Sequence, residues 1–305
     1  MLSFLGRRLV RAVITVFGVL TIAFVIVRLN GSPAQLMLGP DATPENIVAF
    51  DRAYGFDRSI PEQLLTFVGN GLQGDFGESI RFGRPSVELV LDQLPSTLLL
   101  AGSAFLFGLL LAFVLTLVVE LYGGRRLRNA VLWIGALVQA VPTFLLGVLA
   151  ILVFAIWLKL LPALGADGPT SLILPAVTLG LFEVALYVRL FAVSFDEQRS
   201  LDYVRTAYSK GQSRRAVVLH HMLPNAALPL LTVAGINLGQ LIGGTVVIET
   251  VFNWPGAGQL IYQAVSAKDY PVVQAGVVVI AALFVLINLV VDLLYAVLDP
   301  RVRLS

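Results

Sequence analysis

A few charged and amide side chains stand inside long apolar stretches of this sequence. Glu183 and Arg189 lie in one stretch, and Asn288 and Asp292 lie in another. A charge in such a stretch is costly, so Glu183 is a candidate for lining a solute pathway or for a structural hydrogen bond. Arg189, six residues away, lies on roughly the opposite helix face and near the end of its stretch, where it can reach water. Asn288 and Asp292 are four apart and share a helix face, which favours a bond to a neighbouring helix or to another subunit over a place in the pathway.

No set of residues has the spacing of a known catalytic site. The sequence lacks the phosphate-binding Walker A pattern, the Gly-x-Ser-x-Gly elbow and the zinc-binding His-Glu-x-x-His pattern. It contains no cysteine, which excludes thiol catalysis and thiolate metal sites. His220 and His221 are adjacent and point about 100° apart on a helix, so they are poorly placed to hold one metal ion. We therefore expect that this chain is not an enzyme and binds neither a metal nor a cofactor.

The composition indicates that lipid is the solvent of this chain. Of its 305 residues, 57% are hydrophobic and only 13% are charged, and the mean hydropathy is +0.87. Soluble domains have about 25% charged residues. The net charge of +2 is small, so the composition gives no reason to expect nucleic-acid binding.

Crossing a bilayer takes about 20 mostly apolar residues in a helix, and six stretches meet this requirement. The first is longer than the apolar core of a signal peptide, so we expect it to be retained as a helix. Pro142 stands inside the third stretch and predicts a kink there. The prediction is an all-α membrane protein of one domain, residues 1–305, with about six spans. They are 9–29, 94–119, 130–158, 172–194, 228–248 and 273–298.

The basic residues of the connections give an orientation. Thirteen Lys and Arg residues fall on one side, whereas the two short connections on the other side hold only Lys159 and Lys268. Because short cytoplasmic loops retain positive charge, both termini are predicted to be cytoplasmic. Residues 30–93 then form an extracytoplasmic insertion after the first span. Thr43-Pro44-Glu45 is typical of a helix start, so we expect this insertion to contain short helices.

The connection between the fourth and fifth spans, residues 195–227, carries the most specific pattern, and we name it the Gly211 loop. Gly211 divides it into two short amphipathic helices, because glycine readily adopts the left-handed conformation that ends a helix. Ser213 is a suitable N-cap for the second helix, which we expect to end near Pro224. Two helices locked by a turn form a rigid body that a partner protein can push. The alternative is an ordinary basic loop without a partner.

The Gly211 loop resembles the "EAA" loop of the permeases of ATP-binding cassette (ABC) importers. That loop reads Glu-Ala-Ala, three residues, Gly, nine residues, Ile, one residue, Leu-Pro, and this spacing is kept here. His221 replaces the Ile, and the run Asp-Tyr-Val-Arg-Thr-Ala is typical of the peptide and nickel branch. The resemblance implies that the loop transmits motion from an ATP-binding subunit. The residues assigned to this coupling role are Asp202, Tyr203, Arg205, Thr206, Ala207, Gly211, Leu223 and Pro224.

Segments along nearly the whole chain are similar to dipeptide and oligopeptide permeases. They are residues 54–63 and 74–79, residues 244–258 and residues 292–303. The chain departs from that pattern at residues 30–33, where Asn-Gly-Ser-Pro replaces the usual Pro-Gly-Asp-Pro. The turn at the outer end of the fifth span is either a part of the outer gate or an ordinary loop. The candidate gate residues are Glu249, Phe252, Pro255, Gly256 and Gly258.

The resemblance implies the permease of a type I ABC importer in the bacterial plasma (inner) membrane. Such a chain forms half of a pathway for peptides by alternating access. It implies a second homologous permease, two ATP-binding subunits that use ATP and Mg, and an extracytoplasmic solute-binding protein as partners. The alternative is a secondary transporter or channel driven by an ion gradient, which calls for a relay of intramembrane acids and an inverted repeat. Only Glu183 and Asp292 are candidates for a relay, and no repeat is visible.

Overall fold

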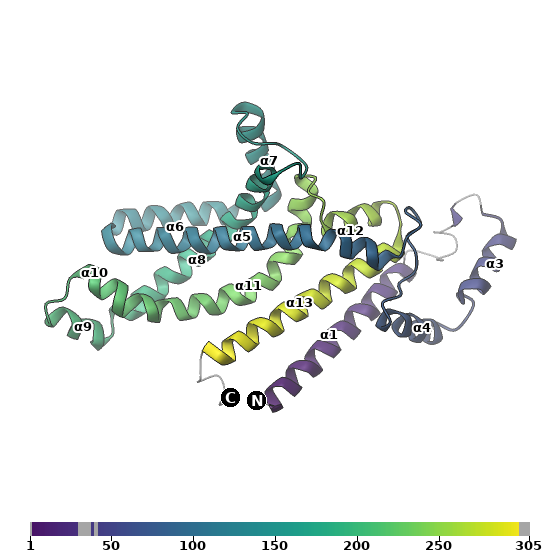
Figure 1. Ribbon diagram of the computed structural model, residues 1–305, viewed down its shortest axis with the longest axis horizontal. Coiled ribbons are helices and arrows are strands. Elements are labelled where there is room, and N and C mark those ends of the chain that lie inside the picture. The colour runs from purple at the N-terminus through teal and green to yellow at the C-terminus, as the bar shows by residue number, and fades with distance from the viewer. Residues whose placement is uncertain (1, 30–37, 40–41, 299–305) are drawn as a thin grey trace. The chain divides into compact units, whose positions relative to one another are not determined.

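The computed structural model describes residues 2–29, 38–39 and 42–298. Nearly all of these residues are helical, and no strand occurs among them. Helix follows helix from the purple N-terminal end to the yellow C-terminal end in Figure 1. The predicted all-α fold class is confirmed.

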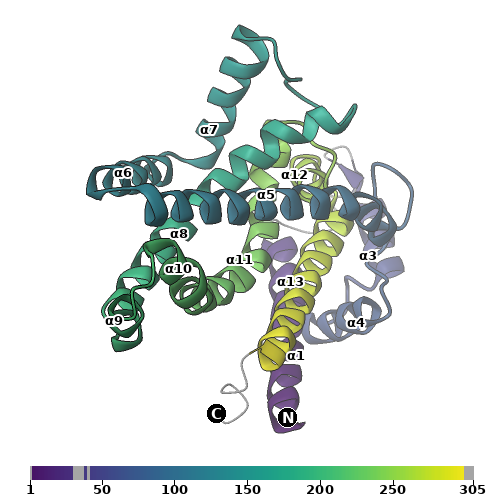
Figure 2. The same ribbon diagram turned by 60° about the vertical axis from the view of Figure 1, so that its left-hand side comes forward.

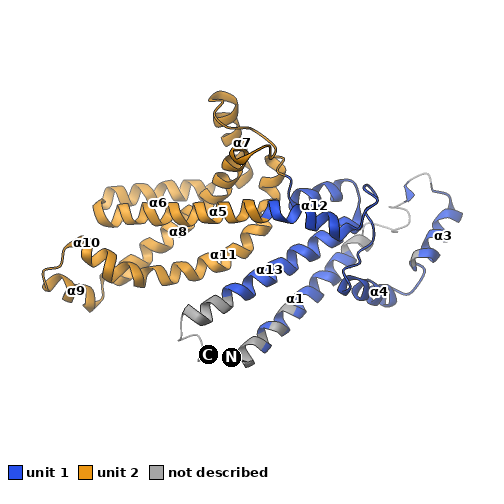
Figure 3. Ribbon diagram, viewed as in Figure 1, with its two compact units in different colours: residues 1–97, 255–305 blue, residues 98–254 orange. Residues whose placement is uncertain are grey.

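The chain forms two compact units (Figure 3). Unit 1 consists of residues 1–97 and 255–305, and unit 2 consists of residues 98–254. Helix α5 (Ser86–Tyr122) begins in unit 1 and continues into unit 2. The single permease domain over residues 1–305 stays a prediction.

Unit 1 is built around two long helices from distant parts of the sequence. α1 (Leu2–Leu29) packs against α13 (Tyr270–Leu298), and the two run side by side in both Figure 1 and Figure 2. α12 (Ala257–Ser266) also contacts α13, and α4 (Ile60–Leu72) contacts α1. The first and the last predicted spans are therefore direct neighbours.

Short helices follow α1, as the Thr43-Pro44-Glu45 pattern predicts. α3 (Pro44–Tyr54) begins after Thr43, whose hydroxyl accepts a hydrogen bond of 3.3 Å from the backbone N–H three residues later. The proline at the start of α3 has no N–H to leave unpaired, and Glu45 complements the positive end of the helix. α5 begins at Ser86, so the last part of the predicted insertion 30–93 belongs to this helix. The unusual turn at 30–33 lies outside the described residues.

A buried carboxylate joins two turns of unit 1. Asp269 lies between α12 and α13 with 2% of its surface exposed. It accepts a hydrogen bond of 2.5 Å from the Ser79 hydroxyl and longer bonds from the backbone N–H groups of Ile80 (3.2 Å) and Arg81 (3.4 Å). These bonds to a charged acceptor attach the chain before α5 to the α12–α13 turn.

Unit 2 is organised around α8 (Ile173–Arg199). This helix contacts α6 (Arg125–Ala140), α7 (Thr143–Ala150) and α11 (Leu223–Val251). α8 and α11 lie side by side in Figure 1 and Figure 2. The fourth and fifth predicted spans therefore pack together.

Two glycines let α5 and α8 approach closely. A Cβ atom on Gly180 of α8 would lie 2.6 Å from the carbonyl oxygen of Ala104 on α5. A Cβ on Gly108 of α5 would lie 2.7 Å from the Cβ of Glu183 on α8. Small residues at such contacts let the backbones of membrane helices meet.

All six predicted spans are helical, although they differ from the prediction in length and continuity. In α1 the described apolar stretch, Val13–Val25, is shorter than a full span. A fifth candidate consists of two bent pieces, Arg125–Ala140 and Thr143–Trp157. Among the described residues, four helices are long and apolar enough to cross a membrane. They are Ser86–Tyr122, Pro169–Arg199, Arg214–Val251 and Tyr270–Val291.

The third predicted span, 130–158, is broken rather than kinked. α6 ends at Ala140, and the chain turns by 100° before α7 and the π-helical segment η1 (Ile151–Trp157). Pro142 has no N–H to donate and disfavours a helical conformation for the residue before it. Val141 is accordingly extended, with φ of −95° and ψ of 129°. The sequence thus predicted the position of the break and underestimated its angle.

Candidate functional site

The Gly211 loop folds as a helix, a glycine turn and a second helix. α9 (Asp202–Ser209) is followed by Gly211 with φ of +78°, the left-handed conformation predicted for it. Its N–H donates to the carbonyl of Tyr208 at 3.0 Å. Ser213 then caps α10 (Arg214–Ala216) by accepting a bond of 3.3 Å from the third N–H of that helix.

The second helix does not end near Pro224, which corrects the prediction from sequence. α10 continues through the π-helical segment η3 (Val217–Met222) into α11. The N–H of Leu223 bonds five residues back, to the carbonyl of Val218. Pro224 therefore lies inside a continuous helix, directly after the π-helical turn, where the shifted hydrogen bonds accommodate a residue without an N–H.

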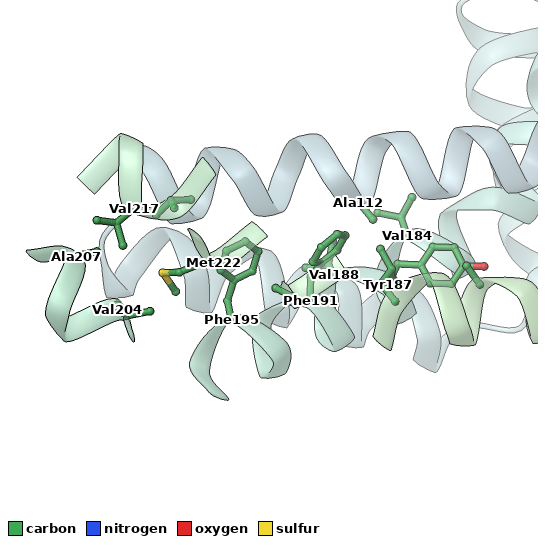
Figure 4. Packing of buried hydrophobic residues seen from close by; sticks show 14 residues of the cluster. Ala112, Val184, Tyr187, Val188, Phe191, Phe195, Val204, Ala207, Val217 and Met222 are labelled. Carbon is green, nitrogen blue, oxygen red and sulfur yellow. The ribbon is translucent and has the colours of Figure 1, made fainter. Parts of the chain in front are cut away.

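Buried side chains attach the Gly211 loop to the body of unit 2. Val204 and Ala207 of α9 are 2% and 5% exposed and belong to one hydrophobic cluster that continues through η3 and α8. Figure 4 shows Val204 and Ala207 close to Met222 and Phe195 at one end of this cluster. Rotating α9 alone would expose these side chains, so the loop and the helices behind it are expected to move together.

Other predicted coupling residues present polar groups at the surface of the loop. Asp202, Arg205 and Thr206 are exposed. The ion pair between Arg205 and Asp202, with a distance of 3.6 Å, is exposed to solvent. Such a pair contributes little to stability. Tyr203 is half-buried and donates its hydroxyl to the Gln198 side chain over 2.6 Å. Burial raises the pKa of the Tyr203 hydroxyl.

An ion-pair network lies beside the loop and connects α5, α6 and α8. Glu120 of α5, 3% exposed, accepts from Arg199 of α8 at 2.5 Å. Arg199 also approaches Asp196 at 3.3 Å. Arg128 of α6 binds Asp196 through both terminal guanidinium nitrogens. Removing one partner of a buried charge such as Glu120 is costly, so the network fixes these three helix ends together.

A hydrogen-bonded pair lies within the apolar part of unit 2. The Asn237 side chain of α11 donates to the Glu183 carboxylate of α8 at 3.3 Å. Glu183 is 8% exposed and Asn237 is 9% exposed. This contact is a hydrogen bond of the structural kind considered for Glu183, and the role of Glu183 in helix packing or in a pathway stays a prediction.

Among the side chains that the structure describes, the other candidate residues within the spans have no hydrogen bond to a neighbouring helix. Arg189 is exposed on α8. Asn288 donates to the carbonyl of Phe284 in its own helix at 2.8 Å. Asp292 lies in α13, but its side chain is outside the described residues. A bond between α13 and a neighbour through Asn288 and Asp292 stays a prediction.

The candidate outer gate divides between the two units. In unit 2, α11 ends at Val251, and Glu249 and Phe252 are almost completely buried, at 0% and 1% exposed. Phe252 packs in a cluster with Trp254. In unit 1, Gly256 is the N-cap of α12 and is buried together with Gly258, whereas Pro255 is exposed. A gating role for these residues stays a prediction.

Comparison with known families decides what kind of protein this geometry belongs to. The profile of the family described as "Binding-protein-dependent transport system inner membrane component" matches residues 96–304. The profile of the N-terminal part of the same membrane component matches residues 1–101. The chain belongs to this family. It is a membrane-spanning permease subunit of an ABC importer, as its resemblance predicted.

Relatives match the permease over almost its whole length. The glutathione transport system permease protein GsiC of Escherichia coli K12 is 37% identical over 304 residues, which cover 99% of each chain. The protein of the same name from Shigella flexneri serotype 5b is 36% identical over the same length.

Two solved transporters share the fold of the permease. An inward-facing structure of the MetNI methionine ABC transporter matches with a TM-score of 0.54 at 18% identity, over 69% of this chain and 96% of the other. An amino acid ABC transporter matches with a TM-score of 0.52 at 14% identity, over 70% and 94%. The type I importer fold is therefore confirmed.

Sequence reasoning missed three polar contacts of the folded permease, of which only the first involves a candidate residue, Glu183. Asn237 is an amide inside an apolar span, a signal as clear as that of Asn288. Glu120 and Arg199 each lie at a span end, where single charges are common, so nothing in the sequence pairs them. Asp269 lies in a short turn whose contact with Ser79 spans 190 residues of sequence.

Proposed function

We propose that the permease forms half of the translocation pathway of an ATP-driven importer of di- and oligopeptides. One observation carries the cargo class: 37% identity, over 99% of both chains, to a permease of a glutathione transport system. Glutathione is a tripeptide, and the pattern of the Gly211 loop is typical of the peptide and nickel branch. A small peptide is the cargo class that fits both features.

The proposed mechanism is alternating access driven through the Gly211 loop. ATP binding closes the two ATP-binding subunits, which hold ATP and Mg, and this movement displaces α9. Because Val204 and Ala207 are packed into the cluster with α8 and η3, the displacement reaches the long helices without being absorbed in the loop. The permease transmits the motion through the Gly211 loop, whereas its partner subunits hydrolyse the ATP.

The proposed assembly contains a second homologous permease, two ATP-binding subunits and an extracytoplasmic solute-binding protein. The large excess of Lys and Arg on one side supports a cytoplasmic location for the Gly211 loop and both termini, in the bacterial plasma membrane. Residues 30–93 and the candidate gate then face the outside. The binding protein would approach this outer side.

A secondary transporter driven by an ion gradient is the competing function. It calls for intramembrane acids free to exchange protons or sodium. Glu183 is instead bonded to Asn237 within the core of unit 2. This contact favours a structural carboxylate over a relay.

The decisive experiment is to purify the tagged permease in mild detergent from its native host and identify the bound proteins by mass spectrometry. We expect two kinds of partner, ATP-binding subunits and a second permease. Vesicles containing this assembly should take up a labelled tripeptide only with ATP inside and the binding protein outside. Uptake driven by a proton gradient without ATP would contradict the proposal, and ATP-dependent uptake of another solute only would contradict the peptide cargo alone.

A further inference from the structure

A cavity of about 680 Å³ opens in unit 2 beside the Gly211 loop. Its walls come from the end of α5, the start of α6, the end of α8 and the segments α10 and η3. The lining has a charged part and an apolar part. The charged part consists of four arginines and two carboxylates, namely Arg125, Arg128, Arg199, Arg214, Glu120 and Asp196.

The charges of this cavity do not balance. The ion-pair network described above takes up both carboxylates and two of the arginines. The other two, Arg125 and Arg214, have no carboxylate within ion-pair distance in the part of the chain that the structure describes. Arg214 donates a long bond of 3.5 Å to the carbonyl of Gly123. Two positive charges are therefore left in excess, and an anion is the complementary ligand.

The start of α6 adds to this preference. Gly124 precedes the helix and offers no side chain to cap its first N–H groups. The positive end of the helix dipole therefore lies at the same wall of the cavity as Arg125. The arginines supply the net charge, and the helix end reinforces its sign.

The apolar part of the lining distinguishes between kinds of anion. Along one face of α6, Arg125 and Arg128 are followed by Asn129 and Leu132, so the wall changes from charged to apolar towards the middle of the helix. Facing residues continue the apolar wall. Free phosphate has no group for such a wall, whereas a phospholipid has acyl chains next to its phosphate. The apolar lining residues are Val119, Leu132, Val218 and Met222.

We propose that this cavity binds the headgroup of an anionic phospholipid. Its phosphate lies between Arg125 and Arg214, and the first carbons of its acyl chains lie against Leu132, the least buried of the apolar lining residues. Basic pockets between membrane helices are suited to such headgroups. The bound lipid connects α6 to α10 and so steadies the Gly211 loop. The proposal requires only that the chain lies in a bilayer, and it is independent of the cargo and of the orientation.

Native mass spectrometry of the purified permease, with any subunits that remain bound, tests the proposal. The protein is delipidated and titrated separately with phosphatidylglycerol and with phosphatidylcholine. We expect one phosphatidylglycerol to bind more tightly than any phosphatidylcholine. Arg125→Gln and Arg214→Gln should each weaken this first binding event about 5-fold, and together about 25-fold.

Matched controls separate this site from general attraction to positive charge. Arg126→Gln and Arg215→Gln remove neighbouring charges that do not line the cavity and should leave the first binding event unchanged. Arg125→Lys with Arg214→Lys should retain most of the affinity, which shows that a loss in the Gln variants is not a folding defect. Equal binding of the two lipids, or equal losses in the Arg126 and Arg215 controls, would overturn the proposal. Complete displacement of the lipid by millimolar inorganic phosphate would assign the cavity to a free anion instead.

Discussion

Asn237 and Glu183 form a hydrogen bond of 3.3 Å between α11 and α8, and each is less than a tenth exposed. Each helix also has many apolar contacts with the other, so the bond is a small part of the total interaction. Its importance lies in what remains if one partner is lost. A buried carboxylate or amide without a partner is costly in an apolar interior.

We predict that Asn237→Leu lowers the free energy of unfolding by about 1–2 kcal/mol. Glu183→Leu alone should have a similar effect, and the double variant should lose less than the sum of the two. The measurement is reversible unfolding in mixed micelles, evaluated as a double-mutant cycle. Asn288→Leu is the control, because Asn288 bonds within its own helix and should change stability less. Strictly additive losses would show that the bond is absent.

We predict that Gly180→Ala destabilises the permease by about 1–3 kcal/mol, because the new methyl would lie 2.6 Å from the Ala104 carbonyl oxygen. The substitution raises helix propensity, so propensity alone predicts the opposite sign. Gly102→Ala on α5 is a matched control, since nothing lies within 4 Å of a Cβ there. It should be neutral or slightly stabilising. Thermal unfolding of both variants gives the answer, and a stable Gly180→Ala protein would refute the close approach of α5 and α8.

We predict that Gly211→Val uncouples ATP hydrolysis from uptake while membrane insertion stays normal. No atom lies within 4 Å of a Cβ on Gly211, so the effect is one of backbone conformation and not of space. A left-handed residue other than glycine costs about 1–2 kcal/mol, and a β-branched residue is the least suited to this conformation.

The matched variant Gly211→Asn should retain most of the coupling, because asparagine tolerates the left-handed region. ATPase rate and peptide uptake are measured on the same vesicles. Normal uptake by the Gly211→Val transporter would count against a coupling role of the loop.

We predict that Asp269→Ala makes residues 79–85 accessible to protease and costs about 1–3 kcal/mol, because the Ser79 hydroxyl and two N–H groups lose their acceptor. Asp92→Ala is the control. It removes an ion pair of 3.0 Å with Arg84 in which both side chains are more than half exposed, and such pairs contribute at most about 1 kcal/mol. Equal protease resistance of the two variants would mean that Asp269 does not hold this segment.

Features governed by neighbouring residues in the sequence could be predicted. The start of α3 at Thr43 and Pro44 depends on local hydrogen bonding, and the left-handed Gly211 depends on the missing Cβ. The long apolar stretches also gave the positions of the helices. These properties need no knowledge of distant contacts.

Features that depend on other helices could not be predicted in the same way. Pro142 marks a break in the chain, but its 100° angle is set by what the two pieces pack against. Pro224 stands inside a continuous helix because η3 shifts the hydrogen bonds before it. The partners of Glu183 and Asp269 lie 54 and 190 residues away, and no spacing rule connects them.

The number of residues in the π-helical turn η3 sets the rotation of the Gly211 loop about the axis of α11. One residue of an α-helix corresponds to a rotation of about 100°, and a π-helical turn accommodates one residue more than an α-helical turn. Deleting a single residue within Val217–Met222 could restore α-helical bonding and leave α11 undisturbed, yet it would turn α9 and α10 by about a quarter of a circle. The number of residues in η3 thus determines which face the Gly211 loop presents. A one-residue deletion there is expected to abolish coupling to the ATP-binding subunits while the packing of the membrane helices stays intact.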